Sequence, residues 1–157
     1  ADFGDVSIVS VYHPSGTSGD ERQDFKMIWL EDFQKYVVEL QKSRPNLILC
    51  GDYNICHEPI DIHDPIRNAK NSGFLPEERE WMTRFLSAGF TDTFRFLNPD
   101  KQEYTWWSYR FNSRSKNKGW RIDYCMVSDN MKPKVKAAYI LNDAVHSDHC
   151  PAVLEIE

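Results

Sequence analysis

The spacing of apolar positions changes along this chain and predicts alternating strands and helices. Residues 6–12, Val-Ser-Ile-Val-Ser-Val-Tyr, alternate with a period of two, which predicts a strand. A long helix is expected next, beginning at a capping box of Ser18 and Glu21 and ending at Arg44-Pro45. Its expected apolar face comprises Phe25, Ile28, Trp29, Phe33, Tyr36, Val37 and Leu40.

The second part of the pattern adds one more helix and several strands. Residues 46–50 are nearly all apolar, which is typical of a strand buried on both faces. After an irregular stretch from 57 to 72, Pro76 opens a helix over 77–88 that Gly89 ends. Further strands are expected at 104–110, 120–128, 135–140 and 152–156. This order predicts a layered α/β or α+β domain.

Composition narrows the class of protein. A length of 157 residues corresponds to about one domain, and 41% hydrophobic residues allow a real core. No apolar run approaches the roughly 18 residues of a membrane span, so we expect no membrane partner. The acidic N-terminus, Ala-Asp-Phe-Gly-Asp, is not a signal peptide. The four cysteines lack zinc spacing, and a reduced, cytoplasmic protein is predicted.

The net charge of −5 argues against a polyanionic partner, but the local charge distribution argues for one. Residues 110–121 contain five basic side chains and no acidic one, interleaved with Asn and Ser. The five are Arg110, Arg114, Lys116, Lys118 and Arg121. Such a composition is typical of a phosphate-binding loop, and a solvated loop is the alternative.

Polar side chains collect where three predicted strands begin or end. Residues 47–50 run into Gly-Asp-Tyr-Asn with Asp52 and Asn54, Asp123 opens another apolar run, and Ser-Asp-His-Cys-Pro at 147–151 precedes the last strand. Hydrolytic sites are built in this way, on loops held by a stiff sheet. The sequence has no serine elbow or cysteine nucleophile signature, so water is the expected nucleophile. Turn chemistry at 51–54 and a surface role for His149 are the alternatives.

Several other side chains can be read as site residues or as ordinary packing. Asp123 within reach of His149 would fix the tautomer of the imidazole, as in triad chemistry. Trp106, Trp107 and Trp120 flank the basic loop, and aromatics there suit either a slot for a base or sugar or the core. Asn68 and Asn71 lie in a polar-basic loop that can also be plain surface, and Tyr12 can contact a phosphate or simply pack.

Four motifs together resemble the exonuclease III and apurinic/apyrimidinic (AP) endonuclease family. They are Gly-Asp-Tyr-Asn-Ile at 51–55, Asn-Ala-Lys-Asn-Ser-Gly-Phe at 68–74, Ser-Lys-Asn-Lys-Gly-Trp-Arg-Ile-Asp-Tyr at 115–124 and Ser-Asp-His-Cys-Pro at 147–151. The first and last belong to the larger endonuclease/exonuclease/phosphatase superfamily. The third resembles the abasic-site enzymes more specifically.

The resemblance implies catalytic and metal-binding roles for named residues. Asp52 would orient or deprotonate the attacking water beside Asn54, and Asp123 would orient His149, which would bind the scissile phosphate. Tyr12 would contact the phosphate. Asp148, with Asp52 and Asn54, would lie at a site for Mg²⁺ or Mn²⁺.

The resemblance also implies a DNA-binding surface. Asn68 and Asn71 would approach the DNA backbone, and Arg110 would probe the base stack near the lesion. Lys116 belongs to the basic loop that would grip phosphates. Trp106, Trp120 and Ile122 would form the pocket for the flipped-out abasic deoxyribose. The implied partner is double-stranded DNA with abasic sites or 3′ ends.

Residues 1–157 resemble only the C-terminal portion of that family's domain, a four-layer α/β sandwich of two packed sheets. We expect one sheet with its helices, an edge of the other sheet, and an apolar face that the missing N-terminal half or a neighbouring chain covers. That half carries the family's main metal-ligating Glu, so the 157 residues alone are expected to be inactive. The alternatives are another superfamily phosphatase or phosphodiesterase and a non-catalytic DNA-binding fragment.

Overall fold

A five-stranded mixed sheet forms the centre of the computed structural model, which describes residues 1–157. The strands are β1 (Asp2–Phe3), β2 (Val6–Tyr12), β3 (Leu47–Asp52), β4 (Phe90–Asp92) and β5 (Asp123–Ser128), in the spatial order β1-β2-β3-β5-β4. Only the β2–β3 pair is parallel, and α1 (Asp20–Ser43) connects its two strands. The remaining pairs are antiparallel.

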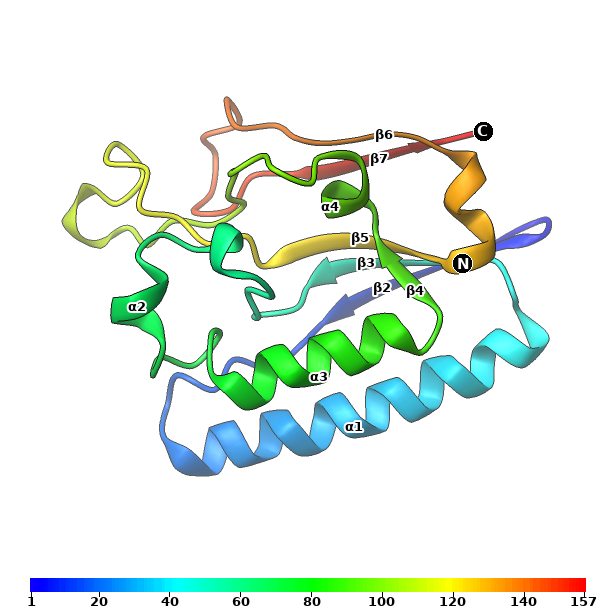
Figure 1. Ribbon diagram of the computed structural model, residues 1–157, viewed down its shortest axis with the longest axis horizontal. Coiled ribbons are helices and arrows are strands. Elements are labelled where there is room, and N and C mark those ends of the chain that lie inside the picture. The colour runs from blue at the N-terminus through cyan, green and yellow to red at the C-terminus, as the bar shows by residue number, and fades with distance from the viewer.

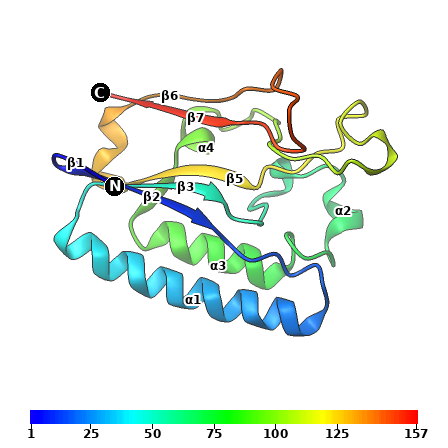
Figure 2. The same ribbon diagram turned by 180° about the vertical axis from the view of Figure 1, so that it is seen from behind.

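Two helices cover one face of this sheet, as Figures 1 and 2 show. They are α1 and α3 (Pro76–Ser87), which lie side by side below the strands. The main core lies between these helices and the sheet and includes Leu30, Val37, Leu47, Leu49, Trp81, Phe85 and Met126. All seven side chains are fully buried, so this interface is the main source of hydrophobic stabilisation in the chain.

A separate two-stranded sheet lies on the opposite face of the central sheet. β6 (Val135–Ile140) and β7 (Ala152–Ile156) form an antiparallel hairpin above β5 in Figure 1. Leu154 and Ile156 pack on a small cluster of Ile48, Val127 and Met131. The mixed α/β class, with one flanked sheet and part of a second, is therefore confirmed.

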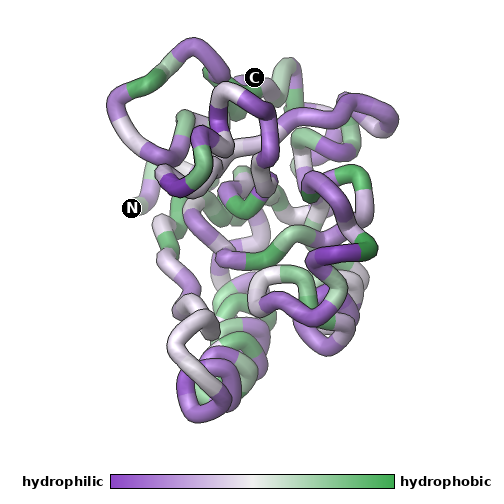
Figure 3. Tube along the Cα trace, turned by 90° about the vertical axis from the view of Figure 1, so that its left-hand side faces the viewer, coloured by the Kyte–Doolittle hydropathy of each residue, from purple (hydrophilic) through white to green (hydrophobic).

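Short helices and loops complete the chain. The helices are α2 (Pro65–Asn68) and α4 (Thr93–Leu97), with 3₁₀ helices η1 (Pro59–Asp61), η2 (Arg110–Asn112) and η3 (Asp129–Lys134). Both termini lie at the end of the sheet away from the long loops (Figures 1 and 2). Figure 3 views the loop end, where the tube is mostly hydrophilic. No helix has the length and apolarity needed to span a membrane.

The start and the buried face of α1 differ from the sequence prediction. The N-cap is Gly19 without a side-chain hydrogen bond, so the capping box of Ser18 and Glu21 was wrong. Phe25, Ile28, Trp29 and Tyr36 are exposed, whereas Lys26, Leu30, Phe33 and Val37 are buried. The buried stripe accepts Lys26 because Glu78 on α3 pairs with its ammonium group. That partner lies 52 residues away, so helical spacing could not reveal it.

The strand predicted at 104–110 does not form. Trp106 makes only isolated bridges, to Trp120 and to His149, and the segment ends in η2. The strand predicted at 120–128 begins at Asp123, because the preceding residues pair with the segments around residues 62 and 106. The strand predicted at 46–50 extends to Asp52. The strands predicted at 6–12, 135–140 and 152–156 have the predicted bounds.

Candidate active site

The two central strands place two carboxylates side by side. Asp52 ends β3 and Asp123 begins β5, and the two residues are direct partners in the antiparallel ladder. Side chains of directly opposed residues project from the same face of a sheet. Gly51 allows β3 to reach this point, because a Cβ there would lie 1.8 Å from the carbonyl oxygen of Val11 on β2. The Gly51-Asp52 pair is therefore explained by the close backbone packing at Gly51 as well as by the chemistry of the Asp52 side chain.

His149 completes a compact group with these carboxylates. Its Nδ1 lies 2.9 Å from Asp123 Oδ2. An ionised carboxylate has no proton to donate, so Nδ1–H is the donor and Nε2 is left free of partners in the chain. Ligand atoms of Asp52, Asp123 and His149 all lie within 4.8 Å of one another. The tertiary fold therefore brings together three residues that the sequence placed on three separate strand ends.

The electrostatics of the group follow from burial and from this pairing. Burial and the nearby carboxylate of Asp123 raise the pKa of Asp52 to about 6. The hydrogen bond with Asp123 raises the pKa of His149 above its ordinary value, against the effect of burial. Asp52 thus holds its proton more readily than an ordinary aspartate, and His149 holds its proton more readily than an ordinary histidine.

Asn54 lies in a strained turn directly after β3. Its φ of 52° is in the left-handed region, and its Nδ2 donates to the His13 carbonyl and to Asp52 Oδ2. Its backbone N–H donates to Asp52 Oδ1 at 2.8 Å. Lys26 donates to the Asn54 carbonyl at 2.9 Å. These contacts hold the Asp52 carboxylate in one orientation and leave Asn54 Oδ1 without a partner in the chain.

These residues lie in a cleft of about 1000 Å³ at the loop end of the sheet. Trp106 and Trp120 form one wall, with their rings in an edge-to-face arrangement and centroids 6.1 Å apart. Gly73 lies against Trp120, and a Cβ at this glycine would come within 2.9 Å of the indole ring. Further residues around the cleft are Tyr12, Thr17, Gln23, Lys70, Asn71 and Ile122. The cleft therefore combines aromatic walls with a polar floor.

The predicted site residues separate into those at the cleft and those outside it. Tyr12, Asp52, Asn54, Asn71, Trp106, Trp120, Ile122 and His149 line the cleft, and Asp123 lies behind His149. Asn68 is buried, donates to the carbonyls of His63 and Asp64, and accepts from Asn71 Nδ2 at 2.7 Å. Its amide therefore positions Asn71 instead of facing a ligand. Arg110 and Lys116 lie on an exposed loop beyond the cleft.

The carboxylate of Asp148 is hydrogen-bonded within the chain. Its Oδ2 accepts a hydrogen bond from Trp106 Nε1 at 3.0 Å, and its Oδ1 accepts one from Ser147. It does not belong to the close group of Asp52, Asp123 and His149. Asp123 therefore joins Asp52 in the candidate donor set, and the metal-binding role expected of Asp148 stays a prediction. The carboxylate of Asp148 fixes the orientation of an indole in the cleft wall.

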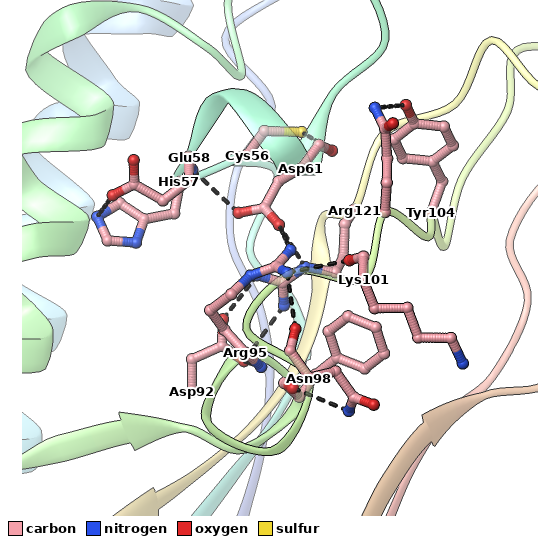
Figure 4. Close-up of polar contacts among 12 residues, drawn as sticks. Cys56, His57, Glu58, Asp61, Asp92, Arg95, Asn98, Lys101, Tyr104 and Arg121 are labelled. Carbon is pink, nitrogen blue, oxygen red and sulfur yellow. Dashed lines mark hydrogen bonds and ion pairs between the residues drawn. The ribbon is translucent and has the colours of Figure 1, made fainter.

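Two of the five basic residues at 110–121 are not available to an external phosphate. Arg121 is 1% exposed and binds Asp61 and Asp92, as Figure 4 shows. Arg114 donates to three backbone carbonyls of the loop before β7. Arg110, Lys116 and Lys118 make no side-chain hydrogen bond or ion pair in the chain, so they are the free cations of this loop.

Lys26 is a site residue that sequence reasoning missed. It is fully buried, supports the Asn54 turn and pairs with Glu78, which also accepts from the backbone N–H groups of Gly73 and Leu75. One ion pair thus joins the loop that carries Asp52 and Asn54 to the loop that carries Asn71. The only sequence signal was a lysine next to an apolar helical stripe, a common pattern on helix surfaces.

Residues 2–149 match the family model described as the Endonuclease/Exonuclease/phosphatase family. The chain belongs to this family. An exodeoxyribonuclease of Bacillus subtilis is 46% identical over 156 residues, which is 99% of this chain and 62% of that protein. The DNA repair nuclease APEX1 of Danio rerio is 46% identical over 155 residues, which is 98% of this chain and 50% of that protein. The chain thus spans between half and two thirds of these relatives.

Solved structures of related enzymes share the fold. The 3′ phosphatase NExo from Neisseria, bound to a product DNA hairpin, superposes with a TM-score of 0.94 at 27% identity. That match covers 98% of this chain and 62% of the other. An AP endonuclease from Archaeoglobus fulgidus superposes with a TM-score of 0.89 at 26% identity, over 97% of this chain and 62% of the other.

Proposed function

We propose that this chain carries catalytic residues of a DNA repair nuclease that hydrolyses phosphodiester bonds 5′ to abasic sites and at 3′ ends. The observation that supports this most is the close group of Asp52, Asp123 and His149, of which Asp52 and His149 line an aromatic-walled cleft and Asp123 lies behind His149. The names of the relatives, an exodeoxyribonuclease and a DNA repair nuclease, favour the same chemistry. The activity belongs to a whole domain, of which this chain supplies the residues named here.

In this proposal the attacking group is a water molecule next to Asp52. A carboxylate with its pKa raised to about 6 accepts a proton better than an ordinary aspartate while remaining mostly ionised at neutral pH. Asn54 holds that carboxylate through two hydrogen bonds, which reduces the loss of freedom on reaching the reactive geometry. Asp52 and Asn54 therefore act as the base and its positioning partner.

His149 takes the complementary role at the phosphate. Its Nδ1–H is used by Asp123, so Nε2 is the atom that can face a phosphate oxygen. The raised pKa of His149 favours the imidazolium, which stabilises the negative charge that develops as water attacks phosphorus. Tyr12, at the end of β2 and lining the same cleft, is placed to donate to that phosphate as well.

The residues at this end of the cleft supply some, but not all, of the ligands that a divalent cation needs. Asp52 and Asp123 offer carboxylate oxygens. Asn54, whose Nδ2 contacts Asp52, offers an amide oxygen. Hard cations such as Mg²⁺ or Mn²⁺ prefer oxygen donors. Three protein donors are fewer than the roughly six ligands of Mg²⁺, so water, phosphate oxygens or other polypeptide must supply the rest. When bound, the ion would neutralise charge on the transferring phosphate.

The DNA-binding part of the proposal rests on the loops around the cleft. Arg110, Lys116 and Lys118 are exposed cations on one loop, and Lys70 and Asn71 lie on a second loop beside the cleft. Trp106, Trp120 and Ile122 present an apolar wall next to the reactive group, which suits an unstacked sugar. A duplex lying across both loops would bring one phosphate to His149.

The test is a cleavage assay with the full-length protein and three substrates in Mg²⁺. A duplex with one abasic site should be cut, and a 3′-phosphate duplex and an inositol phosphate serve as competing substrate classes. Asp52→Asn and His149→Ala should each lower kcat by about 10²- to 10⁴-fold while DNA affinity changes little. Cleavage of only the inositol phosphate, or DNA binding without cleavage, would overturn the proposal. Variants within a few-fold of wild type would remove those residues from the mechanism.

A further inference from the structure

Arg114 holds the loop that carries His149. Its Nη1 donates to the Ser147 carbonyl at 3.0 Å, and its Nη2 donates to the carbonyls of Asn142 at 3.0 Å and Ala144 at 2.6 Å. The guanidinium also lies over the Trp107 ring, 4.6 Å from its centroid. One side chain therefore gathers three carbonyls from a six-residue stretch of backbone.

That stretch has little else to fix it. Asn142, Val145 and His146 are exposed, and within this stretch only Ala144 packs against a core cluster. No other side chain donates a hydrogen bond to the backbone of residues 142–147. Arg114 thus supplies the side-chain hydrogen bonds to this stretch, beside the backbone bonds of Asn142 to Ile140 and of Ala144 to Leu141. In contrast, α1 and α3 are held by a large apolar interface.

The anchored backbone leads directly to His149. Ser147, whose carbonyl Arg114 binds, accepts the His149 backbone N–H on its hydroxyl at 3.1 Å. The next carbonyl, that of Asp148, accepts a hydrogen bond from the backbone N–H of Trp107 at 3.0 Å. Arg114 and Trp107 therefore hold consecutive peptide groups just before the histidine. The 2.9 Å contact of His149 with Asp123 requires that this backbone stay in place.

Arg114 also belongs to the exposed basic loop. Arg110 and Lys116 lie on the same loop, with their side chains free of partners in the chain. A phosphate bound by those cations would order the loop from which Arg114 reaches the carbonyls. Contact of the loop with DNA would thereby affect the position of His149 through the side chain of Arg114.

We propose that Arg114 is a positioning residue that holds His149 against Asp123 and links its placement to DNA contact by the basic loop. The inference rests on the proposed nuclease function and deepens it. An arginine is needed because its planar fork presents several donors in fixed directions, whereas a lysine ammonium is a compact group that cannot span the same three carbonyls. The residue acts through His149 and does not need to touch the substrate.

The experiment compares Arg114→Ala, Arg114→Lys, Arg110→Ala and Lys35→Ala in the full-length protein on a duplex with one abasic site. Arg114→Ala should lower kcat about 10- to 100-fold with a smaller change in KM, and Arg114→Lys should recover only part of the loss. Guanidinium ion at millimolar concentration should restore part of the kcat of Arg114→Ala, compared with NaCl at equal ionic strength. Arg110→Ala, which loses a free cation, should act mainly on KM and its salt dependence. Lys35→Ala, on the outer surface of α1, should match wild type.

The outcomes separate the two proposals. If wild type does not cleave DNA, the proposed function fails. If wild type cleaves and Arg114→Ala keeps its kcat, or loses only affinity as Arg110→Ala does, Arg114 is a phosphate contact or a bystander and the inference is overturned. Thermal unfolding of each variant checks the fold. A kcat loss that tracks a fall in Tm in both Arg114 variants, without guanidinium rescue, would assign Arg114 a role in stability alone.

Discussion

Asp52 and Asp123 are direct partners across β3 and β5, so two carboxylates occupy the same end of one ladder, where Asp123 binds His149. Like charges at this separation are unfavourable, and the strands fix them there because apolar pairs of the same ladder, such as Leu49 with Met126, are buried in the core. Burial and electrostatic repulsion from Asp123 together raise the pKa of Asp52 to about 6. The ionised Asp52 that the proposed reaction needs therefore lowers the stability of the folded protein.

The first prediction concerns the stability cost of the ionised Asp52. A raised folded-state pKa means that the folded protein binds the Asp52 proton more tightly than the unfolded chain, so the charged form costs stability above pH 6. Asp52→Asn should raise the free energy of unfolding at pH 7.5 by up to about 3 kcal/mol while abolishing most activity. The gain should shrink as the pH falls from 6 to 4, because wild type then takes up the proton.

Chemical denaturation of both proteins at pH 7.5 and pH 4.5, without divalent metal, measures this difference. The second hydrogen bond from Asn54 Nδ2 is lost in the variant, which reduces the gain without reversing it. A variant that is less stable than wild type at pH 7.5 would show that Asp52 is not held at an electrostatic cost.

The second prediction concerns the free cations of the basic loop. Lys116 and Lys118 are exposed and have no partner in the chain. If both bind phosphates, their double substitution by Ala should reduce the slope of log K against log salt by about 1.8, or about 0.9 for each contact. Binding of a duplex at several salt concentrations measures the slope, with Lys132→Ala on η3 as the control. An unchanged slope would make the loop a solvated turn.

The third prediction concerns the buried ion network of Figure 4. Arg121 binds Asp61 and Asp92, and Arg95 also binds Asp61, so two carboxylates are balanced by two guanidinium groups. Arg121→Ala leaves the buried Asp92 without its cation and Asp61 with Arg95 alone, and should lower the free energy of unfolding by about 3–5 kcal/mol. Arg110→Ala, on the surface of the same loop, should change it by less than about 0.5 kcal/mol. Equal effects of the two substitutions would contradict a structural role for the network.

The fourth prediction concerns the 157-residue polypeptide expressed by itself. Its oxygen donors near the cleft are Asp52, Asp123 and Asn54, which are too few for well-placed Mg²⁺. Metal placement contributes several kcal/mol in such reactions, so cleavage of abasic DNA should be more than about a hundredfold below that of the full-length protein at any Mg²⁺ concentration. A gel assay of both proteins, with the fold checked by circular dichroism, decides this. Comparable turnover would mean that residues of this chain complete the metal site.

The sequence by itself determined the elements whose signals are local. Alternation located the strands at 6–12, 135–140 and 152–156, and Pro76 and Gly89 bounded α3. The strand-end motifs also located Asp52, Asp123 and His149, which the fold brings together. These predictions succeed because backbone periodicity and turn chemistry depend on neighbouring residues.

Only the tertiary structure decided which charged side chains are available to a ligand. Arg121 and Arg114 lie in a segment whose composition is typical of a phosphate-binding loop. However, Arg121 pairs with a carboxylate 60 residues away, and Arg114 binds carbonyls about 30 residues away. Asp148 turns to Trp106, and Lys26 turns inward to Glu78. A buried charge is stable only with a partner, and partners distant in sequence are set by packing of the whole chain, which no local pattern encodes.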